Sequence, residues 1–131
     1  AHPDHPLARL RACSFAQTLD HDHVGLPTHT AVHTMLGRAA AIIGKPIAYR
    51  AVISTFDAAL RCVQAGLGVA VVPREIARRS GGLSRMKIVP LKDAWARRRF
   101  AICFRSHERL SPAARLLVDH LQQSCTGSDA P

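Results

Sequence analysis

Residues 63–77, VQAGLGVAVVPREIA, constrain the fold more than any other part of this chain. Gly66 and Gly68 flank a leucine, and an apolar run then occupies residues 69–72 before Pro73. A helix commonly ends at a glycine, because glycine adopts the left-handed conformation without steric cost. An apolar run without polar alternation is typical of a strand that is buried on both faces of a parallel sheet. The stretch therefore predicts the end of a helix at Gly66, a turn and a buried parallel strand.

Helical periodicity appears upstream and downstream of this stretch. One predicted helix ends at Gly44 and buries Val32, Met35, Leu36, Ala39 and Ile43. A second opens at Ser54, which stands three residues before Asp57 in a capping arrangement, and buries Phe56, Ala59, Leu60 and Val63. A third starts at Ser111-Pro112, and its apolar face is formed by Ala114, Leu117, Val118 and Leu121.

Short apolar segments between these helices are the candidate strands. We predict strands at residues 24–26, 49–53, 69–72, 86–91 and 99–105, and a short helix at residues 74–79. Strands and helices then alternate along most of the chain. This order predicts an α/β fold with a mostly parallel sheet.

Composition and cysteine usage exclude several classes of protein. No apolar run approaches the roughly 18 residues of a membrane-spanning helix. The net charge of +9 is spread along the chain, and with Trp95 and Tyr49 as the only large polar aromatics we expect no base-stacking platform. The four cysteines are far apart and form no CxxC pair, which predicts reduced thiols and a cytoplasmic location.

The motifs that carry common enzyme chemistry are absent from the sequence. It has no G-x-S-x-G nucleophile elbow, no phosphate-binding lysine loop and no G-x-G-x-x-G that opens a helix, so we expect neither an enzyme nor a cofactor. The histidines include His21 and His23, and also His29 and His33 four residues apart. Because no cysteine or carboxylate completes a familiar ligand set, we expect no metal site, and a histidine-dependent metal enzyme fragment remains an alternative.

Two predicted helices begin directly after predicted strands. Thr28 and His29 precede the first of them, and Ser54, Thr55 and Phe56 open the second. Helix N-termini present free N–H groups and a positive dipole end, and ligands of open α/β sheets bind beyond the carboxyl ends of the strands. These five residues are therefore the candidate site for a small anion, a carboxylate. The alternative is that their hydroxyls only cap the helices.

Several segments together resemble one known family. They are HPLA at residues 5–8, DHDHVGLP at 20–27, ISTFDAALRCVQAGLGVAVVP at 53–73, a spaced VPL-D-WARR pattern within 83–98, and LSPAARLLVDHL at 110–121. In order and spacing, the chain resembles the C-terminal part of the effector-binding domain of LysR-type transcriptional regulators.

The resemblance implies a fold similar to that of periplasmic solute-binding proteins, with two α/β subdomains and an effector between them. Residues 8–91 would form the second subdomain, and residues 97–124 the return strand and C-terminal helix of the first. The rest of the first subdomain and the N-terminal winged helix-turn-helix that binds DNA would lie in the parent protein. The family's contacts in this subdomain match Ser54, Thr55 and Phe56, and more weakly Thr28 and His29.

The resemblance further implies that the chain is a ligand-sensing domain. An effector would alter the conformation of a homodimer or homotetramer that binds DNA through the N-terminal module, with no role for a membrane. Two other functions remain open at this point: a solute-binding protein of a transport system, and a purely structural association module.

Overall fold

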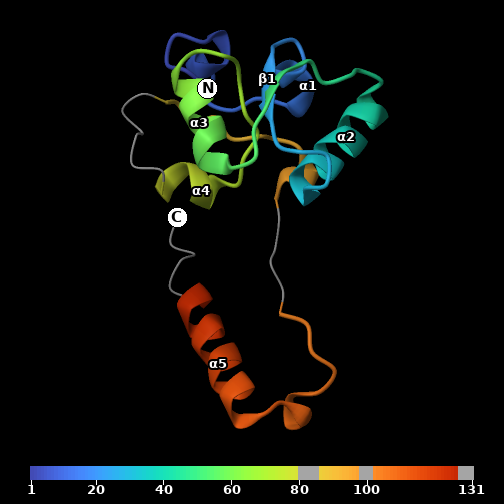
Figure 1. Cartoon of the computed structure of the whole chain (residues 1–131), viewed down its shortest axis with the longest axis vertical. Coiled ribbons are helices and arrows are strands. Elements are labelled where there is room, and N and C mark those ends of the chain that lie inside the picture. Colours follow the sequence, from blue (N-terminus) through green and yellow to red (C-terminus); the bar gives the residue numbers. More distant parts are fainter. Residues whose placement is uncertain (80–85, 98–101, 127–131) are drawn as a thin grey trace. The chain divides into compact units, whose positions relative to one another are not determined.

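The computed structural model describes residues 1–79, 86–97 and 102–126 of the chain (Figure 1). The chain divides into two compact units, residues 1–97 and residues 98–131. The first unit contains η1 (Pro6–Arg9), α1 (Phe15–Thr18), β1 (His23–Gly25), α2 (Ala31–Ile43), β2 (Tyr49–Val52), α3 (Phe56–Gln64), α4 (Arg74–Arg79) and η3 (Ala94–Ala96). The second contains η4 (His107–Arg109) and α5 (Pro112–Thr126).

A parallel β pair forms the centre of the first unit. β1 and β2 pair with Gly25 opposite Val52. On its other edge β1 makes a parallel bridge to Val69, through N–H···O bonds from Val24 to Val69 (2.8 Å) and from Val69 to Asp22 (2.9 Å). The order across the unit is thus β2, β1 and the Val69 segment, all running in one direction. The predicted α/β organisation with a mostly parallel sheet is confirmed.

The predicted strands beyond β2 are shorter than expected. In residues 69–72 only Val69 pairs, with His23 at the start of β1. In residues 86–91 only Leu91 forms a bridge, to Cys13. Residues 102–105 form no strand, and residues 99–101 of that prediction lie outside the described residues. Hydrophobicity alone therefore overestimated the strands in this part of the chain.

Two apolar clusters lie on opposite faces of β1. One joins α1 to α2 and contains Phe15, Leu19, Leu36, Ala39 and Ala40. The other joins β1 to α3 and contains Val24, Ala59, Leu60, Val63 and Met86. Successive side chains of a strand point to opposite faces, so His23 meets the first cluster and Val24 the second. Figure 1 shows α2 and α3 on either side of the strands.

Glycines end both long helices of the first unit, as predicted. Gly44 (φ 75°) directly follows α2, and Gly66 (φ 78°) follows α3 after one intervening residue, the C-cap Ala65. The next amide in each case closes the helix, because Lys45 N–H donates to the carbonyl of Ala40 and Leu67 N–H to that of Cys62. Among the described cysteines, Cys13 is buried, Cys62 half-buried and Cys103 exposed, and all three are free thiols.

The second unit leaves most of its apolar side chains exposed. Ser111 caps α5 by accepting a hydrogen bond from the Ala114 N–H (3.3 Å). Of the apolar face predicted for this helix, Val118 is buried, but Leu117 is 57% and Leu121 40% exposed, beside a 71% exposed Leu116. Among the residues of this unit that the structure describes, no apolar layer covers them. In the portion of the chain that is described, no helix is long and apolar enough to cross a membrane.

We expect the exposed leucines of α5 to drive self-association of the isolated chain. A leucine contributes about 1.5–3 kcal/mol when it is fully buried, so contiguous exposed leucines favour contact between copies. Sedimentation velocity should show a mass that rises with protein concentration. The double variant Leu116→Ser with Leu117→Ser should reduce that rise, whereas Ile42→Ser, at an 87% exposed position in the first unit, should not. A monomer at all concentrations would contradict the expectation.

His23 is the most deeply buried ionisable side chain of β1. It is 1% exposed; its Nδ1 faces the His21 carbonyl (2.9 Å) and its Nε2 faces the Thr18 hydroxyl (3.2 Å). Burial disfavours the charged imidazolium and lowers the pKa of His23 below its usual value. The folded chain therefore holds this side chain neutral at a pH where the unfolded chain protonates it.

We expect the free energy of unfolding to fall as the pH drops below about 6.5, the usual histidine pKa. The unfolded state then binds a proton that the folded state excludes, so protonation favours unfolding. The lowered pKa of His5, caused first by burial, acts in the same direction. Urea titrations between pH 7.5 and 5.5 measure the slope, which the His23→Gln variant should reduce. A free energy of unfolding that is constant or larger at pH 5.5 would contradict this assignment.

Candidate functional site

The carboxyl ends of β1 and β2 lie side by side. Gly25 pairs with Val52, and the next amide, Ile53 N–H, donates to the Gly25 carbonyl (2.9 Å). The two strands are parallel, so the turns that follow them leave the same edge of the sheet. Figure 1 shows the first turns of α2 and α3 on one side of the unit. The structure therefore brings the two groups of sequence-predicted site residues to a common edge.

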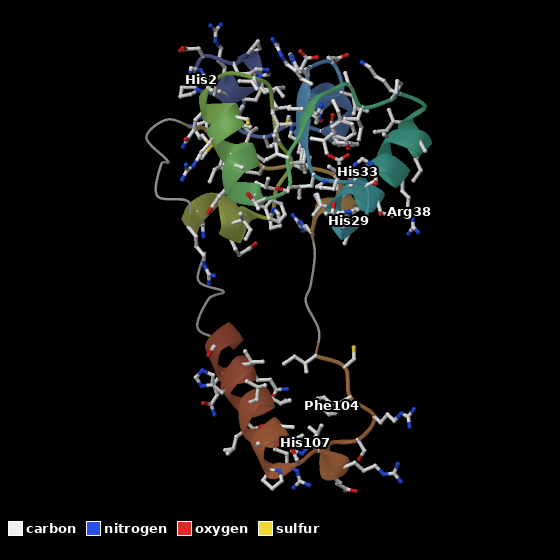
Figure 2. All side chains as sticks on the ribbon, viewed as in Figure 1. His2, His29, His33, Arg38, Phe104 and His107 are labelled. Atoms are coloured by element: carbon white, nitrogen blue, oxygen red, sulfur yellow. The ribbon has the colours of Figure 1, made fainter. Side chains whose placement is uncertain are left out.

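Thr28 and His29 are exposed residues in the turn ahead of α2. Figure 2 shows His29 at this position. The helix begins at Ala31, three residues after Thr28, with Thr30 as its N-cap. The Thr30 hydroxyl accepts a hydrogen bond from His33 N–H (3.2 Å) and donates one to the Pro27 carbonyl (2.8 Å). Thr28 and His29 are therefore not needed to cap α2, and their side chains face solvent.

Thr55, and not Ser54, caps α3. Its backbone is extended (φ −130°, ψ 152°), and its hydroxyl accepts a hydrogen bond from Ala58 N–H (3.3 Å). The prediction that Ser54 opens the helix is wrong by one residue, since the hydroxyl that accepts from the first turn, at the Ala58 N–H, belongs to Thr55. Ser54 is exposed in the turn before the cap, and Phe56 is the half-buried first helical residue.

The common edge, here called the strand-edge site, consists of the turns at residues 27–29 and 53–55 with the first turns of α2 and α3. Each helix start directs backbone N–H groups and a positive dipole end toward this edge. Asp57 lies in the first turn of α3, and its carboxylate repels an anion that approaches this helix start. Arg74 is a positively charged residue of this edge that was not predicted from the sequence. The Val69 segment runs parallel to β1 and therefore leads toward the same edge. There α4 begins at Arg74, which is exposed.

The histidine pairs suggested by the sequence do not converge. His21 contacts His5 edge to face, whereas the ring of His23 is turned into the core, with Nδ1 against the His21 carbonyl and Nε2 against the Thr18 hydroxyl. His33 directs Nδ1 at the Leu26 carbonyl (3.1 Å), and His29 is exposed. Within the described residues, no group of three histidine, cysteine or acidic side chains is arranged to hold a metal ion.

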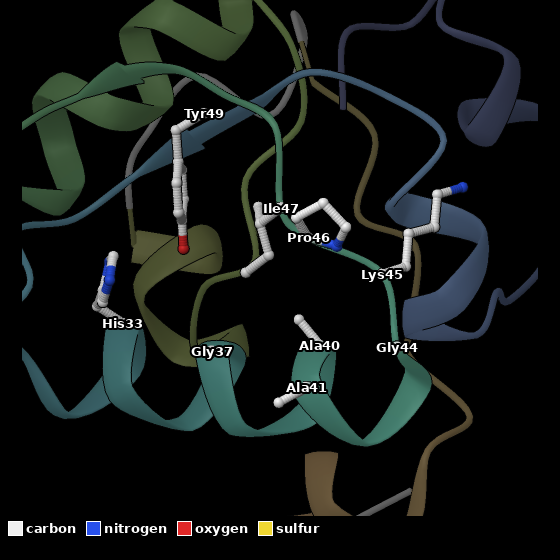
Figure 3. Close-up of a pocket in the computed structure, with 9 residues that line it drawn as sticks. All are labelled: His33, Gly37, Ala40, Ala41, Gly44, Lys45, Pro46, Ile47 and Tyr49. Atoms are coloured by element: carbon white, nitrogen blue, oxygen red, sulfur yellow. The ribbon is translucent and has the colours of Figure 1, made fainter.

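A cavity lies between α2 and the segment that leads into β2 (Figure 3). Its volume is about 340 Å³, and we call it the α2–β2 pocket. Its lining residues come from α2, from the connection and from β2: His33, Gly37, Ala40, Ala41, Gly44, Lys45, Pro46, Ile47 and Tyr49. The sequence analysis did not identify this pocket. The available signal was Gly37, a glycine inside a predicted helix.

Two aromatic rings form one end of the α2–β2 pocket. The rings of His33 and Tyr49 are stacked, with centroids 5.3 Å apart and planes 19° apart. Tyr49 also packs over the last residue of β1, where a Cβ on Gly25 would overlap the tyrosine ring. Burial raises the pKa of the Tyr49 phenol, so its hydroxyl stays protonated at neutral pH. At the other end, Lys45 forms an ion pair with Asp20.

We expect Thr55→Val to destabilise the chain by about 1 kcal/mol, because it removes the oxygen that caps α3. Thr55→Ser keeps this oxygen and should change the free energy of unfolding by a few tenths of a kcal/mol at most. Urea titrations of the three proteins at one pH measure both differences. Equal stability of the valine variant and the parent chain would show that Thr55 does not act as the cap.

Comparisons with known proteins identify a family and relatives that match most of the chain. A family model described as the LysR substrate binding domain matches residues 1–126. The chain is 28% identical over 114 residues to the RuBisCO operon transcriptional regulator of Allochromatium vinosum. The aligned region covers 87% of this chain and 38% of that regulator.

Among solved structures, the chain is similar to the effector binding domain of QuiR in complex with shikimate. The TM-score is 0.61 at 15% identity, over 71% of this chain and 43% of the QuiR chain, so this likeness concerns the fold. This chain thus spans about two fifths of the length of each of these relatives. The matches confirm the resemblance and the fold class, similar to periplasmic binding proteins, that the sequence predicted.

Proposed function

The chain belongs to the LysR substrate binding domain family, and on this premise we propose that it senses a small anionic effector at the strand-edge site. The family is one of binding domains of regulators and not a family of enzymes. The observation that carries the proposal is the Ile53 N–H···O Gly25 bond, because it aligns the two strand ends and the turns that follow them.

The chemistry of the strand-edge site favours a carboxylate. The first turns of α2 and α3 contribute N–H groups and positive dipole ends, and Thr28 and Ser54 add exposed hydroxyls that no helix cap uses. Arg74 adds a positive charge at the start of α4. QuiR provides a parallel, since its effector binding domain was solved with shikimate, which is a carboxylate.

We assign residues 8–91 to the second subdomain of an effector-binding domain, and residues 97–124 to the return strand and C-terminal helix of the first. The exposed leucines of α5 support this assignment, because a helix of a complete subdomain buries such a face. On this assignment the chain carries one wall of the effector cleft. The remainder of the first subdomain, contributed by the parent protein, forms the other wall.

In the parent protein we propose that effector binding favours one closure of the two subdomains. A homodimer or homotetramer would transmit that change to N-terminal winged helix-turn-helix modules, which alone contact DNA. Effector coupling of this kind typically amounts to about 1–3 kcal/mol, which is a 5–150-fold change in affinity. The effector must therefore bind one closure state more tightly than the other.

A titration of the isotope-labelled chain with small carboxylates tests the strand-edge site. Acetate, shikimate and citrate are each compared with a neutral amide or ester of the same acid by nuclear magnetic resonance. The anions should shift the backbone amides of residues 28–31 and 54–57 in a saturable manner, and the neutral partners should not. Because the chain carries one wall of the cleft, we expect dissociation constants on the order of millimolar.

Two variants provide the control for this titration. Ser54→Ala removes an exposed hydroxyl but leaves the Thr55 cap in place, and should weaken carboxylate binding several-fold without a change in stability. Arg11→Gln removes an exposed positive charge elsewhere in the unit and should have no effect on binding. Shifts that are the same for acids and their neutral partners, or that avoid both turns, would contradict the proposal.

A further inference from the structure

We propose that the α2–β2 pocket is a second binding site, for a small planar aromatic molecule that carries a neutral hydroxyl group, in other words a phenol. The pocket adjoins the strand-edge site at His33 in the first turn of α2, but its lining residues include none of the five residues predicted from the sequence to bind an effector. At about 340 Å³ the cavity lies within the usual range for small-molecule sites. This inference goes beyond the proposed function.

Gly37 provides the first argument for the site. It lies in the middle of α2, where glycine destabilises a helix by about 0.5–1 kcal/mol relative to alanine. Its φ is not positive, and a Cβ built on it would meet nothing within 4 Å. Neither the backbone nor close packing therefore requires a glycine at this position. The missing side chain instead leaves the pocket open, because Gly37 forms part of its wall.

His33 and Tyr49 provide the polar groups, side by side at one end of the pocket (Figure 3). The Leu26 carbonyl only accepts hydrogen bonds, so Nδ1 of His33 is the donor in this contact, and in the Nδ1-protonated tautomer Nε2 is an acceptor. The Tyr49 hydroxyl makes no hydrogen bond to any other part of the chain that the structure describes. A ligand hydroxyl can therefore donate to Nε2 and accept from the phenol of Tyr49.

The remaining walls determine the kind of molecule that carries this hydroxyl. They are formed by small and aliphatic residues, and Lys45 is the one further polar side chain among the lining residues. Lys45 is paired with Asp20, so a carboxylate would find its cation already neutralised. The stacked rings of His33 and Tyr49 offer aromatic surface, which favours contact with a flat ring. A neutral phenol fits the apolar walls, carries no charge that would need Lys45, and presents a flat ring to His33 and Tyr49.

The position of the pocket connects it to the end of β1. His33 is hydrogen-bonded to Leu26, and Tyr49 packs over Gly25, so both polar groups of the pocket hold the residues that precede the Thr28 turn. A phenol bound there would contact the two side chains that hold this strand end.

Titration of the labelled chain with phenol itself tests the site. We expect saturable shifts of the backbone amides of Gly37, Ala40, Ala41 and Gly44 and of the ring protons of His33 and Tyr49. For a probe of seven non-hydrogen atoms, the dissociation constant should be on the order of millimolar. Benzene, which lacks the hydroxyl, should bind at least threefold more weakly than phenol.

Gly37→Leu and Arg38→Leu form the matched pair of variants. Both add a leucine to α2, but the first fills the pocket, whereas Arg38 is exposed and points away from the fold (Figure 2). Phenol affinity should fall at least tenfold in Gly37→Leu and stay within twofold of the parent chain in Arg38→Leu. Tyr49→Phe retains the ring and should abolish the preference for phenol over benzene, even if Gly37→Leu fails to fold.

Three outcomes would overturn the inference: shifts that do not saturate, shifts that persist unchanged in a folded Gly37→Leu variant, or an undiminished preference for phenol in Tyr49→Phe. None of them bears on the strand-edge site, whose amides lie at residues 28–31 and 54–57. Conversely, carboxylates that fail to shift those amides leave the phenol result unaffected. The two proposals therefore fail independently.

Discussion

The three residues of β1 hold the first unit together through backbone pairing on both edges. His23 N–H donates to the Ala48 carbonyl (2.7 Å) and Val24 N–H to that of Val69 (2.8 Å). The pairing partners run in the same direction as β1, and this single fact determines which turns meet at one edge. Without these bonds neither the strand-edge site nor the separation of the two apolar clusters would exist.

Close packing around β1 depends on two glycines. A side chain on Gly25 would overlap the Tyr49 ring, and one on Gly68 would overlap the Asp22 carbonyl that Val69 pairs with. Each glycine thus lets another part of the chain approach the strand closely. The first approach brings Tyr49 next to His33 and forms the end of the α2–β2 pocket, while the second brings the Val69 segment into the sheet.

Helices and their ends were the most predictable part of this chain. The apolar periodicity of α2 and α3 and the glycines that follow them are local features, and the structure has them at or within one residue of the predicted positions. Their starts were less accurate, because several adjacent hydroxyl residues compete as caps. Thr55 and not Ser54 caps α3, and Thr30 and not Thr28 caps α2. Which hydroxyl becomes the cap depends on where the preceding strand ends.

The sequence by itself determined the alternation of elements, the resemblance to the LysR family and which residues follow each strand, since these are encoded locally in spacing and residue type. Tertiary structure alone decided which apolar segments become strands, because a strand needs a second segment beside it with which to form backbone hydrogen bonds. Of residues 69–72, Val69 alone has such a partner. It also decided that His33 and Tyr49, sixteen positions apart in the sequence, stack beside the open space at Gly37, because contacts between distant residues exist only after the strands have paired.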